Sequence, residues 1–545
     1  MSANNEYDVA ILGSGIAGGM LGAVLARNGV KTLLLDAGSH PRFAIGESTI
    51  PFTSGMTRII ADRYDVPEIK PLSSFRGVQK HVSRNCGRKQ NFGFIFHREG
   101  ERQNPQQVNQ LVVPAMLRTE SHLFRQDVDT YLFQTAVKYG ADTRLNTRIV
   151  DVDIDPDAGV LLRSDRGDEF RASYVVDAGG FRSPIADKFE LREVPTRART
   201  HSRSIFTHLL GVRPFDKSPV AAAHGQPNPW HNGTLHHVFD GGWMWVIPFD
   251  NHPDSLNPLV SVGLTLDSRV HPKTDMPPEA EFRRFLQRFP DIAWQFEEAR
   301  PVRPWVATGR LQYSAKQIVG DRFCLTSHAA GFIDPLYSRG MTNTLELINM
   351  MAWRLIAAAR DGNWSTERFE YLETVQQGLF DFHDDIVYSS FVAFRDYDLW
   401  NAVNRTWQLG TMLGNVVIED AYYRYSKSGE DKVFLDLEQS RYPGSPFPVS
   451  DRFNELGTFT RQQCQAVEAG TTTPADAASR IFGKIGEADY LPPSFGFADP
   501  ANRCFSASPD KMARNAVWSR RSAPPEIGGM MTRATKGLVR MRLRP

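Results

Sequence analysis

The stretch EYDVAILGSGIAGGMLGAVLARNGVKTLLLDAG, residues 6–38, sets out a strand, a glycine-rich turn, a helix and a second strand. Residues 9–12 are a short apolar run of strand length, and residues 17–28 suit a helix that Gly29 ends. The run VKTLLLD has the composition of a second buried strand and ends in Asp36. This order predicts a βαβ unit with its two strands in parallel.

The glycines of the turn follow the spacing Gly13-x-Gly15-x-x-Gly18, which suits a dinucleotide. Gly13 would make the tight turn, Gly15 would let the backbone approach a pyrophosphate, and Gly18 would let the helix pack on the strand. Free N–H groups and the helix dipole favour phosphate there, and Asp36 is placed to bond a ribose hydroxyl. The motif itself does not separate FAD from NAD. The predicted cofactor-binding residues of this stretch are Gly13, Ser14, Gly15, Ile16, Ala17, Gly18 and Asp36.

Length and charge exclude several classes of protein. The 545 residues correspond to roughly three or four units of about 150 residues, or to fewer interleaved ones. A net charge of +1 gives no general attraction to nucleic acid. Four cysteines show neither paired nor metal-ligand spacing, so we expect no metal site and a reducing, cytoplasmic environment. No signal peptide is seen, and no apolar run approaches the roughly 18 residues of a membrane span.

The run GGWMWVIPFDNHP, residues 241–253, places Trp243 and Trp245 two residues apart in a predicted strand. Both rings then project from the same face of the sheet. One interpretation is core packing, because aromatic side chains suit strands and bury much apolar area. The other interpretation is a functional role, and other segments of the chain favour it.

Two later segments resemble flavin monooxygenases of the hydroxylase fold. They are ASYVVDAGGFRSPIAD, residues 172–187, and VGDRFCLTSHAAGFIDPLYSRGM, residues 319–341. The resemblance implies FAD as the cofactor. Those enzymes have Gly-Asp where this chain has Ser327-His328, so His328 either replaces the acid near the ribityl chain or acts as a base.

The segments IGESTIP (45–51), GWMWVIP (242–248) and GFIDPLYSRG (331–340) together resemble the flavin-dependent halogenases. Trp243-x-Trp245-x-Ile247-Pro248 matches the W-x-W-x-I-P signature of that family. The resemblance covers residues 7 to about 440. Within the family, the chain resembles the free-standing phenol halogenases of the phloroglucinol type.

The resemblance implies an α/β fold: a Rossmann-type FAD-binding domain of the flavin monooxygenase (hydroxylase) fold, interleaved with a mixed β-sheet substrate domain, plus a mainly helical C-terminal region. We therefore expect an FAD-binding core over 1–360, with substrate-domain strands at about 75–110 and 195–310. A mainly helical region with a basic tail is expected over 361–545.

The resemblance also implies the chemistry. Reduced FAD (FADH2) and O2 would give a flavin hydroperoxide, which chloride or bromide would attack to make hypohalous acid. Trp243 and Trp245 would stand between flavin and substrate. The expected substrate is a small, electron-rich aromatic, a free phenol. Because no second glycine motif follows a strand, a separate flavin reductase would supply FADH2; a homodimer is also considered. An aromatic hydroxylase or reductase, or an FAD-binding protein without catalysis, stays open.

Halogen delivery in such enzymes requires a lysine. Residues 77–100 are consistent with two strands joined around SRNCG, and the family places its lysine at the start of the second strand. Lys89 fits as the catalytic residue; it would share a face with Asn91 and Gly93, opposite the phenylalanines that follow. Lys80, in the first of the two strands, is the alternative catalytic residue. Either lysine could also be a solvated strand residue without a catalytic role.

Other residues are assigned by the resemblance. Arg125 would begin a helix and contact FAD, or form a surface ion pair with Asp127 or Asp129. The turn Ser338-Arg339-Gly340 would hold the halide through its backbone amides. The remaining predicted cofactor contacts are Glu47, Ser48, Ile149, Asp334, Gly340 and Met341.

The last 200 residues are less informative. Residues 342–440 have a mainly helical pattern, and the aromatic run at 394–414 either packs on the core or lines a substrate cavity. From residue 443 the composition shifts to Pro, Gly, Ser and Ala, which predicts a helix near 458–484 and irregular structure after it. From Lys511 on the chain is basic, which indicates a solvated tail or a contact with a membrane or another anion.

Overall fold

The computed structural model describes residues 6–113, 119–439, 449–506 and 508–543. The chain divides into two compact units, each built from three separate segments. The first unit holds residues 1–83, 123–198 and 312–381, and the second holds 84–122, 199–311 and 382–545. The helices after residue 382 are therefore grouped with the strands of the second unit and do not form a unit of their own.

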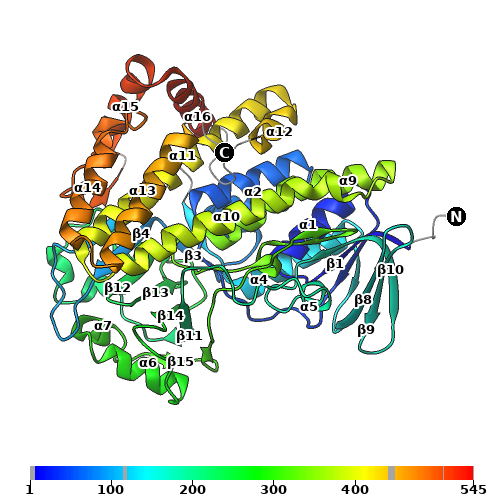
Figure 1. The fold of residues 1–545 in the computed structure, drawn as a ribbon, viewed down its shortest axis with the longest axis horizontal. Helices are drawn as coiled ribbons and strands as arrows, with labels where there is room; N and C mark the ends of the chain where they lie inside the picture. Colours follow the sequence, from blue (N-terminus) through cyan, green and yellow to red (C-terminus); the bar gives the residue numbers. More distant parts are fainter. Residues whose placement is uncertain (1–5, 114–118, 440–448, 507, 544–545) are drawn as a thin grey trace. The chain divides into compact units, whose positions relative to one another are not determined.

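The first unit contains an eight-stranded sheet in the order β17-β18-β10-β1-β2-β7, to which β8 and β9 are added through β10. The central strands β2, β1, β10 and β18 are parallel, as the βαβ prediction requires. Figure 1 shows β8, β9 and β10 side by side; β9 pairs antiparallel with the first part of β10, residues 169–172. The strands are β1 (Tyr7–Leu12), β2 (Thr32–Leu35), β7 (Asp142–Arg144), β8 (Ile149–Asp155), β9 (Gly159–Ser164), β10 (Glu169–Asp177), β17 (Val319–Gly320) and β18 (Phe323–Leu325).

The helices of the first unit include one that corrects a sequence prediction. Residues 75–81 form a helix, not the first of two strands, because Ser74 caps it and Phe75 and Val78 are buried three residues apart. The helices are α1 (Ile16–Arg27), α2 (Pro51–Arg63), η1 (Lys70–Ser73), α3 (Phe75–His81), α4 (Arg125–Lys138), α5 (Pro184–Lys188), α8 (Ser327–Ala330) and α9 (Arg339–Asp361), and α10 (Thr366–Ala393) begins there.

The second unit contains a mixed nine-stranded sheet in the order β15-β11-β14-β13-β12-β4-β5-β19, with β16 paired to β11. Two further strands, β3 and β6, pair only with each other. The strands are β3 (Gly87–Lys89), β4 (Asn91–Phe96), β5 (Val108–Val112), β6 (Glu120–His122), β11 (Ser202–Leu210), β12 (Thr234–Phe239), β13 (Gly242–Pro248), β14 (Val260–Asp267), β15 (Arg300–Pro301), β16 (Val306–Ala307) and β19 (Cys504–Phe505).

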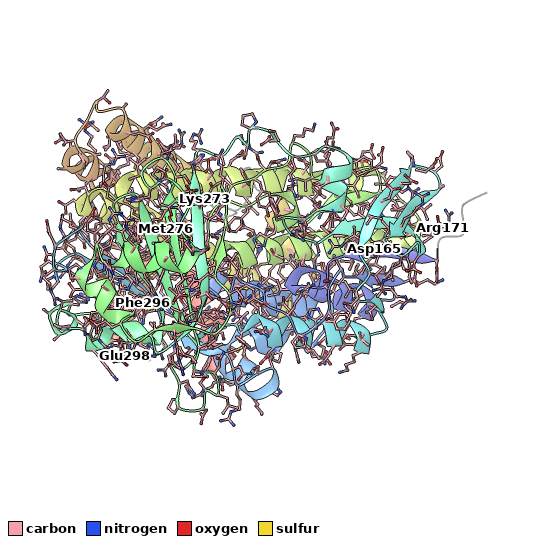
Figure 2. All side chains as sticks on the ribbon, turned by 90° about the horizontal axis from the view of Figure 1, so that it is seen from below. Asp165, Arg171, Lys273, Met276, Phe296 and Glu298 are labelled. Atoms are coloured by element: carbon pink, nitrogen blue, oxygen red, sulfur yellow. The ribbon has the colours of Figure 1, made fainter. Side chains whose placement is uncertain are left out.

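One face of the nine-stranded sheet forms an apolar core with α6 (Pro278–Leu286) and α7 (Pro290–Gln295). Alternate residues of β13 and β14, such as Met244 and Leu264, face this core with Phe285 and Ile292 from the helices. Figure 2 labels Phe296 and Glu298 just after α7. Phe296 is buried in the core, whereas the exposed Glu298 pairs with Arg213 at 2.6 Å. The other face carries the aromatic residues described below.

The C-terminal part of the second unit is helical almost to its end. The predicted helix near 458–484 is two helices that Gly470 separates. The irregular structure predicted after it is wrong, because α15 (Pro509–Arg521) and α16 (Pro525–Leu543) occupy most of that region (Figure 1). Arg533 of α16 forms an ion pair at 2.6 Å with Asp420 of α11 (Tyr397–Ser428), so this part of the basic tail packs on a helix of the second unit. Residues 440–448, where the composition shift begins, lie outside the described residues.

The remaining elements of the second unit are α11 (Tyr397–Ser428), α12 (Lys432–Glu438), α13 (Ser450–Glu468), α14 (Pro474–Gly486), α15 (Pro509–Arg521) and α16 (Pro525–Leu543), with η2 (Phe215–Lys217), η3 (Ala221–Ala223), η4 (Trp230–Asn232) and η5 (Pro493–Phe495). Within the described part of the chain, no helix has the length and apolarity needed to cross a bilayer. The same residues include no cluster of three His, Cys, Asp or Glu side chains that could hold a metal ion.

Candidate active site

The glycine turn of the first unit has the geometry that a bound dinucleotide requires. Gly13 has φ +97°, and a Cβ on Gly18 would lie 1.8 Å from the Gly13 carbonyl oxygen. At Gly15 the atoms nearest to an added Cβ are the ends of Asp129 and Arg42, at 3.6 and 3.8 Å. A side chain therefore has no room at Gly18, where α1 packs on β1. At Gly15, by contrast, only side-chain ends lie near the backbone. This arrangement fits the pyrophosphate of a cofactor at the start of α1.

Asp36 lies at the end of β2, where both of its carboxylate oxygens are already bonded. Ser14 donates to Oδ2 through its backbone N–H and its hydroxyl, each at 2.7 Å. Gly38 N–H and the Arg42 guanidinium donate to Oδ1. Burial would raise the pKa of Asp36, but these hydrogen bonds outweigh it and lower the pKa to about 2. A ribose hydroxyl would therefore share this carboxylate with Arg42.

Arg125 begins α4, and of the two ion pairs considered for it the one with Asp129 is present, but it is buried and not at the surface. It makes a two-pronged ion pair with Asp129, at 2.7 and 2.9 Å, and donates to the carbonyls of Ile45 and Gly46. Asp127 instead accepts a hydrogen bond from Ser83. Arg125 thereby fixes the loop that carries Glu47 and Ser48, both buried. Ile149, at the start of β8, is also buried, two residues after Thr147, whose N–H donates to the Asp36 carbonyl.

The Ser338-Arg339-Gly340 turn starts α9. Ser338 is left-handed, with φ +54°, and its N–H donates to the Pro335 carbonyl at 3.0 Å. Of the three residues predicted to hold halide, Ser338 thus has its amide already bonded. Arg339 and Gly340 occupy the first helical turn, where N–H groups have no acceptor within the helix. This leaves two consecutive amides to serve an anion.

His328 of α8 lies next to the start of α9. A Cβ added to Gly340 would come within 2.8 Å of His328 Nε2, and that nitrogen is buried without a hydrogen-bond partner among the described residues. Burial lowers the pKa of His328 to about 4, so the ring is neutral at pH 7. An unpaired buried nitrogen beside Gly340 fits a polar group of the cofactor. Asp334 and Met341, the other predicted contacts here, are buried.

Glu346 of α9 is a titratable group that the sequence analysis did not identify. It lies two helical turns after Arg339, and both side chains are buried. Burial raises the pKa of Glu346 to about 7, which Arg339 partly opposes. A Glu seven residues after a buried Arg on one helix was a signal for this pair, because such residues share a helix face.

In the second unit, Trp243 and Trp245 lie on the sheet face opposite the apolar core. Their ring centres are 5.7 Å apart, as the period-two prediction requires, and both rings are buried. Trp243 also contacts His236 of β12 at 5.5 Å, and His236 stacks on Phe92 and Phe94 of β4 at 4.6 Å each. We call Phe92, Phe94, His236, Trp243 and Trp245 the aromatic face.

Lys89 lies at one edge of the aromatic face. The sequence analysis predicted that Lys89 and Phe92 project from opposite faces of one strand, but this is wrong, because Lys89 Nζ lies 3.9 Å from the centre of the Phe92 ring. The alternation is broken because Lys89 ends β3 and Asn91 begins β4, so Gln90 separates two strands of different sheets. Lys89 is only 1% exposed, whereas Lys80 is exposed on α3 of the first unit.

Two buried residues near Lys89 were missed by the sequence analysis. Glu120 of β6 pairs directly opposite Lys89 in the strand register. Burial lowers the pKa of Lys89 well below its usual value, and the Glu120 carboxylate opposes this shift. His122, two residues on, donates from Nδ1 to the Pro248 carbonyl, so its Nε2 accepts from Thr234. Burial and then Lys89 lower the pKa of His122 to about 3, so the ring is neutral.

Chemically, this arrangement offers a desolvated amine against flat aromatic walls. Burial lowers the pKa of Lys89 and so favours the free amine, a nucleophile, whereas the Glu120 carboxylate favours the ammonium, a hydrogen-bond donor. The neutral His122 and His236 add no positive charge. Such a site suits an uncharged electrophile and an aromatic ring, and the first unit carries a glycine turn whose geometry fits a dinucleotide.

Comparisons with known proteins bear directly on these two sites. A sequence model of the tryptophan halogenase family matches residues 97–435. The chain is 45% identical to tetracycline 7-halogenase of Kitasatospora aureofaciens, over 99% of this chain and 98% of the relative. It is 46% identical to the monodechloroaminopyrrolnitrin halogenase PrnC of Pseudomonas fluorescens, over 96% and 93%.

A crystal structure of the halogenase PltM with phloroglucinol and FAD superimposes with a TM-score of 0.88 at 34% identity, covering 92% of this chain and all of that one. Both curated relatives are more similar in sequence than PltM, so the likeness does not by itself select a phenol as substrate. Together with the dinucleotide turn and the buried lysine, these matches show that the chain belongs to the tryptophan halogenase family and is a flavin-dependent halogenase, an enzyme that uses reduced FAD, O2 and a halide ion.

Proposed function

We propose that this halogenase acts on a free, electron-rich aromatic, a phenol, and that Lys89 delivers the halogen to it. The observation that supports this most is the position of Lys89: fully buried, 3.9 Å from the Phe92 ring and beside Glu120. A lysine without such a task would be solvated, because burial of an ammonium costs free energy.

Reduced FAD, when bound, supplies the reaction with O2 that oxidises halide to hypohalous acid. The Lys89 ammonium would donate a hydrogen bond to this acid, or the Lys89 amine would hold the halogen as a chloramine. The aromatic carbon then gains the halogen through an electron pair of the ring and loses its proton. In the hydrogen-bonded route, the hydroxyl of the hypohalous acid leaves as water once it has gained a proton. In the chloramine route, the amine takes the halogen from the acid with loss of water, and the N–halogen bond then breaks as the ring takes the halogen and the nitrogen regains a proton. The neutral rings around Lys89 exclude bulk water from this transfer.

Trp243 and Trp245 have a separate role in this proposal. Each ring has only two torsions and both are fully packed, so they form a rigid barrier. We infer that the barrier keeps the aromatic substrate from direct oxygen transfer, which would give a hydroxylated product. A structural role in packing is common to both rings and does not conflict with this one.

The cofactor-binding residues are proposed as predicted: the glycine turn with Asp36, the loop of Glu47 and Ser48 held by Arg125, Ile149, and the Asp334–Met341 segment. Halide is assigned to the amides of Arg339 and Gly340. The support comes from the geometry of Gly13 and Gly15 and from the unpaired nitrogen of His328.

The phenol is supported by the likeness to PltM, whose structure contains phloroglucinol. The two relatives are named for the halogenation of tetracycline and of monodechloroaminopyrrolnitrin, so the second candidate substrate is a multi-ring aromatic of that kind. The described residues hold four free cysteines, which suits a reducing cytoplasm where a separate NADH-dependent flavin reductase supplies FADH2. A homodimer is compatible with this function.

Product mass tests the proposal. The protein is incubated with FAD, a flavin reductase, NADH, O2, bromide and a resorcinol-type phenol. A bromine isotope pattern in the product supports halogenation of a phenol, whereas a gain of one oxygen supports a hydroxylase. If only a multi-ring aromatic carries the isotope pattern, the second candidate is correct. Rapid oxidation of NADH by the purified protein alone would contradict the need for a reductase.

A further inference from the structure

Two amide side chains of α11 are fully buried and incompletely paired. Asn404 and Gln408 are 0% and 1% exposed. Gln408 Nε2 donates to Asn404 Oδ1 at 3.4 Å, but Asn404 Nδ2 and Gln408 Oε1 have no partner among the described residues. Because buried polar groups are nearly always hydrogen-bonded, an unpaired donor beside an unpaired acceptor indicates a molecule that binds there.

The chemistry of that molecule follows from the pairing of the two amides. In the orientation described, the pair leaves the NH2 group of Asn404 and the carbonyl oxygen of Gln408 without a partner among the described residues. Exchanging oxygen and nitrogen in both amides reverses the bond but again leaves one donor and one acceptor. The ligand must therefore present an acceptor and a donor at neighbouring positions.

The amides lie next to the aromatic face. Trp400, Asn404 and Trp407 share one side of α11, at helical spacings of four and three residues. Trp400 contacts Phe94 with ring centres 5.2 Å apart, and Trp407 contacts Phe92 at 5.1 Å.

Phe92 is also the ring that Lys89 Nζ touches. An aromatic ligand held by the two amides would thus lie against the walls that lead to Lys89. The buried Trp243 Nε1 is a further donor on the aromatic face without a partner among the described residues.

We propose that Asn404 and Gln408 recognise the polar substituents of the aromatic substrate, and that this substrate carries a donor and an acceptor side by side, as a carboxamide or a hydroxy ketone does. The inference rests on the proposed function, because only a ring halogenated beside Lys89 would meet these amides. A phenol hydroxyl can donate and accept only through its one oxygen, whereas a carboxamide or a hydroxy ketone presents the donor and the acceptor on separate atoms, one for each amide. The rival occupant is a buried water molecule, which would bond to the amides whatever the substrate.

The test compares 2,4-dihydroxybenzamide with resorcinol, which share the two activating hydroxyls and differ by the carboxamide. Asn404→Leu and Gln408→Met remove each amide at nearly constant volume. We expect kcat/KM for bromination of the benzamide to fall at least about tenfold in each variant, and that for resorcinol to stay within about threefold. Thr406→Val is the matched control, because its hydroxyl bonds to Ala402 and Thr460 instead.

A second measurement does not depend on turnover. 2,4-dihydroxybenzamide is titrated into the FAD-loaded protein without NADH, and tryptophan fluorescence reports binding. The Kd should rise at least about tenfold in the variants and not in Thr406→Val. If a leucine at 404 prevents folding, Asn404→Ser and Gln408→Met carry the same comparison.

The outcomes separate the two proposals. A wild-type protein that binds the benzamide but brominates neither compound counts against the proposed function and supports the amide site. Bromination with an unchanged preference in the variants, or equal losses for both compounds, assigns the amides to a buried water or to packing and overturns the inference. A wild-type protein that neither binds nor prefers the benzamide overturns it as well.

Discussion

Lys89 Nζ lies 3.9 Å from the centre of the Phe92 ring, within the range in which an ammonium is attracted to an aromatic face. Phe92 in turn stacks on His236, with ring centres 4.6 Å apart and the planes 12° from parallel. The lysine is therefore held by a ring and a buried carboxylate in place of water. In this environment burial lowers the pKa of Lys89, and the Glu120 carboxylate opposes that shift.

Glu120→Gln should change the pH dependence of halogenation. The Glu120 carboxylate raises the pKa of Lys89 against the effect of burial, so its removal should lower that pKa further. If the ammonium acts, the loss of activity with rising pH should begin at a lower pH than in the wild type. If the free amine acts, the loss of activity with falling pH should also begin at a lower pH than in the wild type. The profile of kcat/KM against pH distinguishes these cases. An identical profile in the wild type and Glu120→Gln would show that the two groups are not coupled.

Trp243→Ala and Trp245→Ala should each lose packing in the second unit and the barrier that keeps the aromatic substrate from direct oxygen transfer. Each buried ring contributes about 3–5 kcal/mol to the free energy of unfolding, which urea titration measures. The folded fraction should release more peroxide or hydroxylated product per NADH consumed than the wild type. Variants that halogenate without added leakage would leave the two rings with a packing role alone.

Gly263→Ala should destabilise the second unit through one defined contact. A Cβ at this position would lie 2.0 Å from the Trp245 ring, which covers the glycine from the neighbouring strand. We expect a loss of about 1–3 kcal/mol in unfolding free energy, because overpacking forces the ring to move. Trp245→Phe in the same chain should recover part of the loss, and a double-mutant cycle measures that coupling. Additive effects would argue against this contact.

Acid should destabilise the protein through a network of neutral histidines. His237 donates from Nε2 to Gln295 and accepts from His97 at Nδ1, on the core side of the sheet. Burial lowers the pKa of His237 to about 4 from about 6.5 in the unfolded chain. The unfolded state thus binds more protons between pH 6.5 and 4, and stability falls as pH decreases through that window.

The His237 contribution should reach roughly 3 kcal/mol below pH 4, because the shift spans about two and a half pKa units. Thermal unfolding from pH 7.5 to 4 measures it, with His237→Gln as the comparison. The variant should be less stable at pH 7.5 but lose less on acidification. Parallel curves for the two proteins would exclude His237 from the acid response.

The sequence predicted correctly those segments whose local residue pattern is compatible with only one kind of secondary structure. The strand, glycine turn and helix at residues 6–38 combine three independent signals, and the structure confirms all of them. The Trp243–Trp245 pair is similar, because alternate residues of one strand necessarily share a face. Both features depend on contacts within a single element or between neighbouring elements.

Other features depended on contacts distant in sequence. Phe75 and Val78 are compatible with either a strand or a helix, and only the Ser74 cap favoured the helix. The change of strand at Gln90 is decided by β6, whose residues lie some thirty positions later. Ser508 and Pro509 gave a helix-start signal for α15 that the local composition obscured. Asn404 and Gln408 could not be singled out, because unpaired amides are recognised only in a packed structure.

The central claim is that Lys89 delivers the halogen, and Lys89→Ala tests it most directly. The lysine lies in the second unit, whereas the predicted FAD-binding residues lie in the first. The variant should therefore bind FAD with near-normal affinity and still consume reduced flavin and O2. Lys80→Ala, on an exposed residue of α3, is the control and should behave as the wild type.

The measurement is halogenated product per reduced flavin consumed, determined by mass spectrometry for the wild type, Lys89→Ala, Lys89→Arg and Lys80→Ala. We predict a fall of at least about 10²-fold in Lys89→Ala, the scale expected when a positioned donor or nucleophile is removed. Lys89→Arg should restore activity in part if the ammonium acts by hydrogen bonding, and not at all if a chloramine forms. A Lys89→Ala protein that halogenates as well as the wild type, or a loss confined to Lys80→Ala, would contradict the account.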